Sequence, residues 1–274
     1  MRKTAIALLA LGLVVASTAF ASNAVRISQV YGGGGGGSAN TYRYDYVELF
    51  NNNTAPANIG GWSLQYGSAT GSFASNSFGI AVIPAGATIP PCGYYLIQCG
   101  SAGSGGAVLP VTPDLVNLVG PNLGAASGKV ALFTDQVTMR DCPAALANAV
   151  DLVGYGTANC YEGAATIGLL DGTHVGVRNS AGAVDTDRNN LDFSIVLQPY
   201  PMHNTSSPSN PDCLPIGACC LPPLPLGGCV MVSAVQCAQQ GGVYIGNWIP
   251  CVPDPCPATP TRGSTWGQIK TIYK

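Results

Sequence analysis

The sequence predicts an all-β fold, an antiparallel sandwich or barrel that is followed by a small disulfide-rich module. Short segments that alternate apolar and polar residues recur from residue 25 to about residue 199, and turn residues separate them. The 274 residues include 36 glycines and 21 prolines, a share well above average. No window keeps a period of 3.6 residues, and only residues 142–149 could form a helical turn.

The expected strands end at clear turn signals. Residues 25–31 alternate and run into six glycines, 32–37, which lack the Gly-Lys-Ser/Thr ending of a phosphate-binding loop and therefore predict a flexible connection. Residues 44–50 alternate and end in three asparagines, and residues 59–66 alternate again. The remaining strands are expected at residues 93–98, 129–134, 150–155, 175–178 and 193–197.

Alternation also predicts which side chains form the core, because residues two apart in a strand share a face. By the same rule Asp45 and Glu48 point to opposite faces, which is poor geometry for a paired-carboxylate site. The residues expected to point inward are Val47, Leu49, Trp62, Leu64, Leu96, Val130 and Leu132.

The composition limits the classes of function. Charged residues make up 9% of the chain against 47% apolar residues, so there is enough apolar material for a core. The net charge of −2 argues against a basic face that follows phosphates, and no nucleic-acid partner is expected.

The start of the chain predicts export. Residues 1–3 are basic at two positions, residues 5–16 are apolar, and Ala19 and Ala21 are small residues of the kind that signal peptidase reads. A membrane anchor is the alternative, but this apolar run is shorter than the ~20 residues that span a bilayer. We expect residues 1–21 to be a signal peptide and the mature protein to be secreted or held at the cell surface, where cysteines oxidise.

An ordered series of motifs lies at residues 25–32, 45–51, 59–65, 89–98, 128–133, 150–156, 178, 185–189, 192–193 and 199–201. This series resembles a bacterial lamin-tail domain. The resemblance covers roughly residues 25–204, and the domain is expected to span residues 22–201. The resemblance implies an immunoglobulin-like β-sandwich that serves as a non-catalytic binding or attachment module. In bacteria such domains often accompany secreted nucleases, phosphatases or other hydrolases.

The composition changes after this domain. Residues 202–216 are rich in Ser, Asn and Pro and are expected to be a linker. Residues 217–257 resemble a short Cys-rich repeat of exported proteins from environmental bacteria, planctomycetes among them. Its cysteines predict three bridges whose connectivity the sequence leaves open: Cys219, Cys220, Cys229, Cys237, Cys251 and Cys256.

The other cysteines allow a simple pairing by proximity. Cys92 with Cys99 and Cys142 with Cys160 are the nearest pairs in the first domain, which leaves Cys213 as a free or intermolecular thiol. Zinc is the alternative for the terminal cluster, but the cluster has no Cys-x-x-Cys pair and no histidine.

Residues 258–274 form a linker and a terminal tail. Trp266, Ile269, Ile272 and Tyr273 fit one face of a helix. A sorting or attachment signal and a frayed, solvated terminus are both open for residues 266–274.

Catalytic motifs are missing from the sequence. It has two histidines, His174 and His203, and no Gly-x-Ser-x-Gly, His-Glu-x-x-His or Walker sequence, so no enzyme and no cofactor is expected. One cluster of oxygen side chains could bind calcium, while turn capping explains the same residues without an ion: Asp185, Asp187, Asn189 and Asp192.

The sequence therefore predicts a secreted, non-catalytic interaction or attachment protein of the cell surface or extracellular space. Its partner would be a protein or an extracellular polymer. An accessory or substrate-docking subunit of a separately encoded secreted hydrolase, of the nuclease or phosphatase type, is the alternative, and a hydrolase in its own right is the third possibility.

Overall fold

The computed structural model describes residues 25–37, 39–75, 77–138, 142, 149–222, 228–247 and 249–256. The expected signal peptide, 1–21, and terminal segment, 258–274, lie outside this part. Among the described residues, no helix combines the length and the apolar character needed to cross a membrane.

The elements are β1 (Val25–Tyr31), β2 (Asp45–Asn51), β3 (Ala57–Asn58), β4 (Ser63–Ser68), η1 (Ser77–Gly79), β5 (Ile80–Val82), β6 (Thr88–Ile89), β7 (Tyr94–Cys99), β8 (Leu115–Asn117), β9 (Gly128–Phe133), β10 (Ala149–Tyr155), β11 (His174–Arg178), η2 (Ser180–Gly182), α1 (Asn189–Asp192), β12 (Phe193–Leu197), β13 (Ile216–Cys220), β14 (Cys229–Ser233), α2 (Ala234–Gln239) and β15 (Val243–Asn247).

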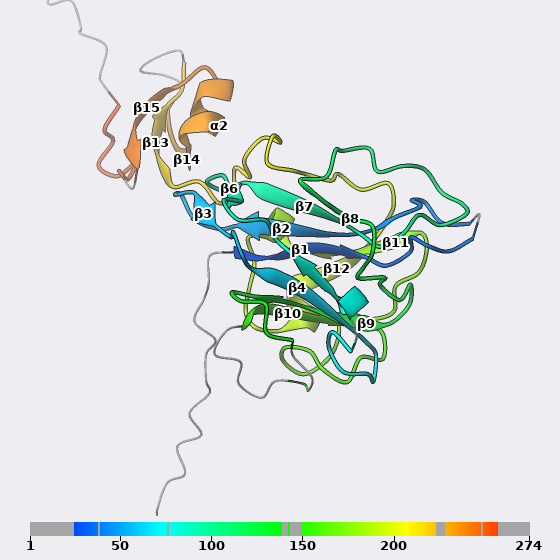
Figure 1. The fold of residues 1–274 in the computed structure, drawn as a ribbon. Coiled ribbons are helices and arrows are strands. Elements are labelled where there is room, and N and C mark those ends of the chain that lie inside the picture. Colours follow the sequence, from blue (N-terminus) through cyan, green and yellow to red (C-terminus); the bar gives the residue numbers. More distant parts are fainter. Residues whose placement is uncertain are drawn as a thin grey trace, which may run out of the picture.

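Two sheets form a sandwich, and the expected immunoglobulin-like all-β fold is confirmed (Figure 1). The larger sheet has the strand order β12-β11-β1-β2-β7-β8, and the smaller has the order β10-β9-β4-β5. Neighbouring strands are antiparallel except β7 and β8, which run parallel. β5 and β8 are edge strands of the two sheets, and the Asn117 side chain joins them by donating to the Ile80 carbonyl oxygen at 3.5 Å.

The core lies between the two sheets and follows the alternation of the strands. Val47 and Leu49 of β2 pack there with Leu64 of β4, as do Val130 and Leu132 of β9. A bulge in β1 shifts the register between Ile27 and Gln29, and both Ile27 and Val30 belong to this core. Trp62 precedes β4 and is only partly buried, packed against the core from its rim.

The expectation for Leu96 is wrong. Its neighbours Tyr95 and Ile97 join the core between the sheets, while Leu96 packs with Tyr31, Tyr46 and Met202 in a second cluster on the other face of the larger sheet. This strand therefore buries both faces, and its alternation between two apolar sets did not indicate which set pointed inward.

The second face is covered by residues 198–213, which we call the strap. Met202 is 6% exposed, and Gln29 donates to the Pro201 carbonyl oxygen at 2.8 Å. Asn210 is also buried and donates to the carbonyl oxygens of Ser180 and Ala181. The expected linker, 202–216, is thus bound to the sandwich over most of its length, because its polar side chains satisfy backbone groups there instead of water.

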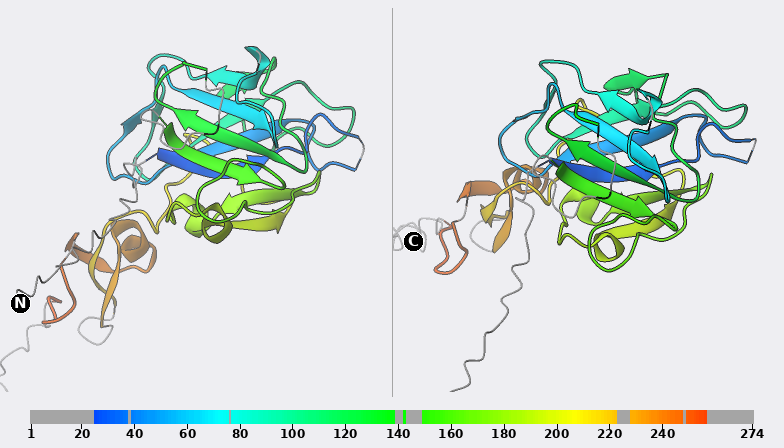
Figure 2. Two further views of the ribbon diagram at one scale, coloured as in Figure 1. Left: turned by 90° about the horizontal axis from the view of Figure 1, so that it is seen from below. Right: turned by 60° about the horizontal axis from the view of Figure 1, so that its bottom comes forward.

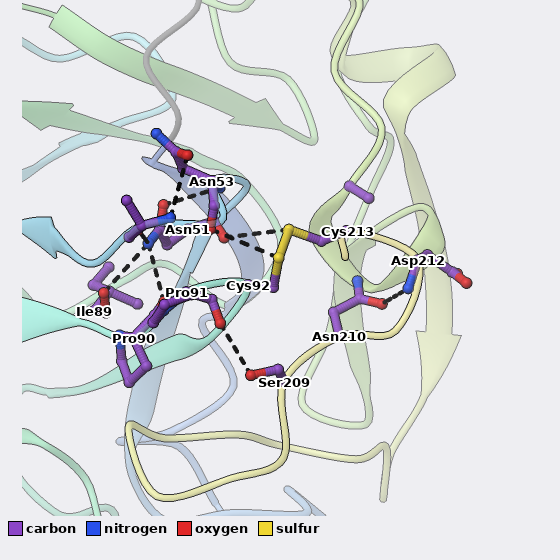
Figure 3. The surroundings of a disulfide bond; sticks show 12 residues. Asn51, Asn53, Ile89, Pro90, Pro91, Cys92, Ser209, Asn210, Asp212 and Cys213 are labelled. Carbon is purple, nitrogen blue, oxygen red and sulfur yellow. Dashed lines mark hydrogen bonds between the residues drawn. A yellow bond between two sulfur atoms is a disulfide. The ribbon is translucent and has the colours of Figure 1, made fainter. Parts of the chain in front are cut away.

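A disulfide between Cys92 and Cys213 fixes the end of the strap (Figure 3). The expected Cys92–Cys99 pair is wrong, because β7 separates these residues and an extended strand of that length holds them roughly 20 Å apart. Cys213 is therefore bridged, and Cys99 is a buried free thiol. Figure 3 shows the bridge beside the Asn51 and Asn53 loop, with Ser209 donating to the Pro91 carbonyl oxygen at 3.0 Å.

The remaining bridges are local. Cys142–Cys160 is present in the sandwich, with Cα atoms 5.4 Å apart. In the Cys-rich module the sheet β14-β13-β15 packs with α2, and a capping box of Ser233 and Gln236 begins that helix. The module lies beside one end of the sandwich (Figure 2). Its three bridges are Cys219–Cys237, Cys220–Cys256 and Cys229–Cys251.

Candidate functional site

A buried arginine organises the end of the sandwich domain. Arg178 of β11 is fully buried, and its Nη2 donates to both carboxylate oxygens of Asp151 at 2.8 and 2.6 Å. Its Nη1 donates to Asp185 at 2.9 Å and its Nε to the Ile27 carbonyl oxygen at 2.8 Å. The guanidinium also lies over the Phe193 ring, 4.6 Å from the centroid. These hydrogen bonds and the Phe193 ring occupy the Arg178 guanidinium, so Arg178 has a structural role and links β1, β10 and β11.

The residues expected to bind calcium surround this arginine but do not share one centre. The Asn189 side-chain oxygen accepts from Gly154 N at 2.8 Å, and Asp192 accepts from the backbone of Thr186 and Arg188 at 2.9 and 3.0 Å. These contacts are the capping arrangement that the sequence left open beside calcium.

Asp185 and Asp187 lie together, and Glu162 is the third member of their group. One oxygen from each of the three carboxyl groups lies within 4.8 Å of the others. Burial, and then repulsion from Asp151, raises the pKa of Glu162 to about 9, so this carboxyl is protonated at neutral pH. The Glu162 carboxyl also accepts from Asn189 Nδ2 at 3.1 Å. Protonation and the hydrogen bond from Asn189 reduce the repulsion that Glu162 adds to this group.

Asp45 is a second buried acid, placed between the sheets. One oxygen accepts from Leu123 N at 2.7 Å, and Oδ1 has no hydrogen-bond partner among the described residues. Burial raises the pKa of Asp45 to about 7. As the alternation predicts, Glu48 of the same strand lies on the opposite face.

Glu48 is the centre of a polar network beneath the strap. Its Oε1 accepts from Ser28 Oγ at 2.7 Å, and its Oε2 accepts from His203 N at 2.7 Å. The His203 ring stacks on Tyr94 with centroids 4.3 Å apart. In a Ser-His-acid triad the serine hydroxyl donates to the histidine ring, whereas Ser28 donates to the Glu48 carboxylate and the His203 ring lies against the same carboxylate, so these three residues lack the geometry of such a triad. The other histidine, His174, pairs with Asp171 at 2.8 Å on the surface.

The side of the molecule formed by β5, β8 and their flanking loops has a different character, and we call it the uncharged edge. From residue 49 to residue 128 the sequence has one charged residue, Asp114, whose carboxylate accepts from Leu96 N at 2.8 Å. Large apolar side chains are exposed along this edge although the rest of the sandwich has a filled core. They are Phe78, Val82, Val116, Leu118 and Val119, which are 52%, 41%, 51%, 58% and 63% exposed.

A pocket with a volume of about 180 Å³ opens beside this edge. It is shaped by backbone contacts: Ala74 N donates to the Tyr66 carbonyl oxygen at 2.8 Å, and a Cβ on Gly79 would lie 2.7 Å from Ala74 Cα. The Tyr66 ring is fixed because its hydroxyl accepts from Gly124 N at 2.9 Å. The lining residues are Tyr66, Gly67, Ser68, Ser75, Phe78, Gly79 and Asn122.

Phe78 and Asn122 were not expected as site residues from the sequence. Neither belongs to a motif, and the loops that carry them meet only in the folded chain, where a Cβ on Gly120 would overlap the Phe78 carbonyl oxygen. The available signal was the long run between residues 49 and 128 in which Asp114 is the single charged residue.

The family described as Lamin Tail Domain matches residues 18–157, which include the strands from β1 to β10. No curated protein matches the chain. The matched region includes the pocket and the uncharged edge, whereas Arg178, the strap and the Cys-rich module lie after it.

Proposed function

The chain belongs to the lamin tail domain family, and on this premise we propose that it is a non-catalytic interaction or attachment module of the cell surface or extracellular space. One observation carries the proposal: most of the charged groups of the sandwich interior are paired or capped, while the uncharged edge presents large apolar side chains to solvent. Such a distribution suits binding to a partner better than acid–base chemistry.

The cysteines support an exported protein. Ten of the eleven form five bridges, which need an oxidising compartment to persist. The expected signal peptide of residues 1–21 would deliver the chain to such a compartment.

The polar networks of the described residues support a role without catalysis. The Arg178 network has no open position for a substrate, and the Glu48 network lies under the strap. His174 is at the surface, and its acidic partner among the described residues, Asp171, is three residues away in the same turn. This arrangement does not supply the converging nucleophile, base and oxyanion donors that a hydrolase requires.

The uncharged edge is the proposed binding surface. β5 and β8 are the outermost strands of their sheets on this side, and exposed apolar residues at sheet edges are typical of contacts with another molecule. The partner would be a protein or an extracellular polymer. A nucleic acid is not proposed, because this edge has no lysine or arginine between residues 49 and 128 to neutralise phosphates.

An accessory subunit of a secreted hydrolase is the second candidate. The division into a sandwich and a separately bridged module favours it, because one unit could dock on the enzyme while the other contacts the substrate (Figure 2). The two candidates differ in the class of partner that the edge binds.

The test is capture of partners from an envelope extract with the mature chain, residues 22–274. Leu118→Asp places a charge on the uncharged edge and should abolish capture. Leu197→Asp is the matched control, since Leu197 is 62% exposed on β12 at the opposite edge of the same sheet. Capture of a hydrolase would favour the accessory subunit. Equal capture by both variants would refute the edge as the binding surface, and turnover of phosphoesters or glycans by the purified chain would refute the non-catalytic role.

A further inference from the structure

We infer that the pocket between β4 and the Phe78 loop binds one sugar ring of a neutral polysaccharide. The inference rests on the proposed function, because it names the ligand class of an interaction module. The residues that line the pocket, the volume of the pocket and its position at the uncharged edge support this ligand.

The lining excludes charged ligands. None of the seven residues around the pocket carries a charge. Two charged residues lie behind the lining, Lys129 next to Gly67 and Asp45 next to Tyr66, but both are buried: Lys129 donates to Asn159 Oδ1 at 2.6 Å, and Asp45 accepts from Leu123 N at 2.7 Å. A phosphate, carboxylate or ammonium group entering the pocket would lose water without gaining an exposed counter-charge, which is unfavourable. This lining favours a neutral ligand.

Aromatic and hydroxyl-type groups meet in this pocket. Tyr66 and Phe78 offer ring surface, and the C–H groups on one face of a pyranose pack well against such rings. Ser68 and Ser75 can donate and accept hydrogen bonds, as sugar hydroxyls also do. The Asn122 amide nitrogen can donate, while its Oδ1 accepts from Ser101 N at 3.3 Å. A proline-rich peptide would use the rings, but it offers mainly carbonyl acceptors and would leave acceptor capacity of these side chains unused.

The size of the pocket selects a single ring. Its volume of about 180 Å³ is smaller than the ~300–1,000 Å³ of pockets that enclose drug-sized ligands. A longer saccharide would leave the pocket at the rim, where Phe78 is half-exposed and continues into the uncharged edge. The pocket thus fits a ring at one point of a polymer whose neighbouring units lie on the surface.

The walls are in place before a ligand arrives. The Ala74–Tyr66 and Gly71–Ser68 backbone hydrogen bonds, 2.8 and 3.2 Å long, hold the loop against β4. The Tyr66 hydroxyl is fixed by Gly124, so ring stacking requires little ordering of the wall.

The experiment is affinity electrophoresis of the mature chain through gels that contain dextran, laminarin, mannan or hydroxyethyl cellulose. Heparin and a soluble proline-rich peptide serve as the charged and the peptidic competitor. We expect retardation by at least one neutral polysaccharide. Phe78→Ala and Asn122→Ala should each weaken it at least tenfold, Phe78→Tyr should keep it, and Leu197→Ala at the opposite edge should leave it unchanged. Matching melting temperatures would show that each variant is folded.

The inference is overturned if no neutral polysaccharide retards the chain, if Phe78→Ala and Asn122→Ala leave the retardation unchanged, or if only heparin or the peptide binds. The envelope capture described above separates this outcome from failure of the proposed function. Capture that depends on Leu118 without any polysaccharide binding refutes the sugar ligand and leaves the interaction module in place.

Discussion

The Cys92–Cys213 bridge should contribute more to stability than any local bridge of the sandwich. It joins residues 121 positions apart, and the nested Cys142–Cys160 bridge shortens that loop to about 100 residues. The chain-entropy relation gives about 4.7 kcal/mol for a loop of this length and about 3 kcal/mol for a loop of roughly 15 residues. Replacing both Cys92 and Cys213 by Ala should therefore lower the free energy of unfolding by up to about 4.7 kcal/mol.

Equilibrium urea unfolding of the mature chain measures this loss. The matched control replaces Cys142 and Cys160 by Ala, whose sequence separation is 18, and should cost about 1.5 kcal/mol less. Limited proteolysis gives a second readout, because release of the bridge should expose the strap, residues 198–213, to cleavage while β1 and β2 stay protected. Equal losses for the two double variants, or an uncut strap, would contradict this account of how the strap is held.

Three further outcomes are expected. Arg178→Met leaves Asp151 buried without its cation and should lower the free energy of unfolding, measured by urea titration, by about 3–5 kcal/mol. Adding Asp151→Leu should recover part of that loss. An unchanged loss in the double variant would show that the unpaired Asp151 charge is not its cause. Burial raises the pKa of Asp45 from 3.8 to about 7, so the stabilisation from protonated Asp45 is complete below about pH 4 and is lost as the pH rises to 7. Urea titrations from pH 4 to 8 should show a falling free energy of unfolding for the native chain and a flatter profile for Asp45→Asn. Parallel profiles would refute this role of Asp45. Thermal melts in EDTA and in millimolar calcium should coincide, because backbone N–H groups already occupy the oxygens of Asn189 and Asp192; a midpoint raised by calcium would instead establish the calcium site.

The amino-acid sequence by itself determined the class of fold and the longer strands of the sandwich, whereas the short strands β3, β5, β6 and β8 were not expected from it. Alternation of apolar residues is a local property, and it correctly placed Val47, Leu49 and Leu64 in the core and separated Asp45 from Glu48. Alternation gave the wrong face for Leu96, because β7 is covered on both faces. Both alternating sets of side chains in this strand are apolar, so the pattern does not indicate which set faces the core between the sheets.

The tertiary structure alone decided the partners of side chains that are distant in the sequence. Cys92 meets Cys213 because the strap returns across the larger sheet, a path that no local pattern encodes. For the same reason a Ser/Asn/Pro-rich segment that resembled a linker became part of the sandwich, once Gln29 and Glu48 supplied partners for its backbone. Asn189 could have served an ion or a backbone amide, and the position of Gly154 in β10 selected the amide. The spacing of residues in the sequence indicates which polar groups are available, but only the packing of the strands determines which donor reaches each oxygen.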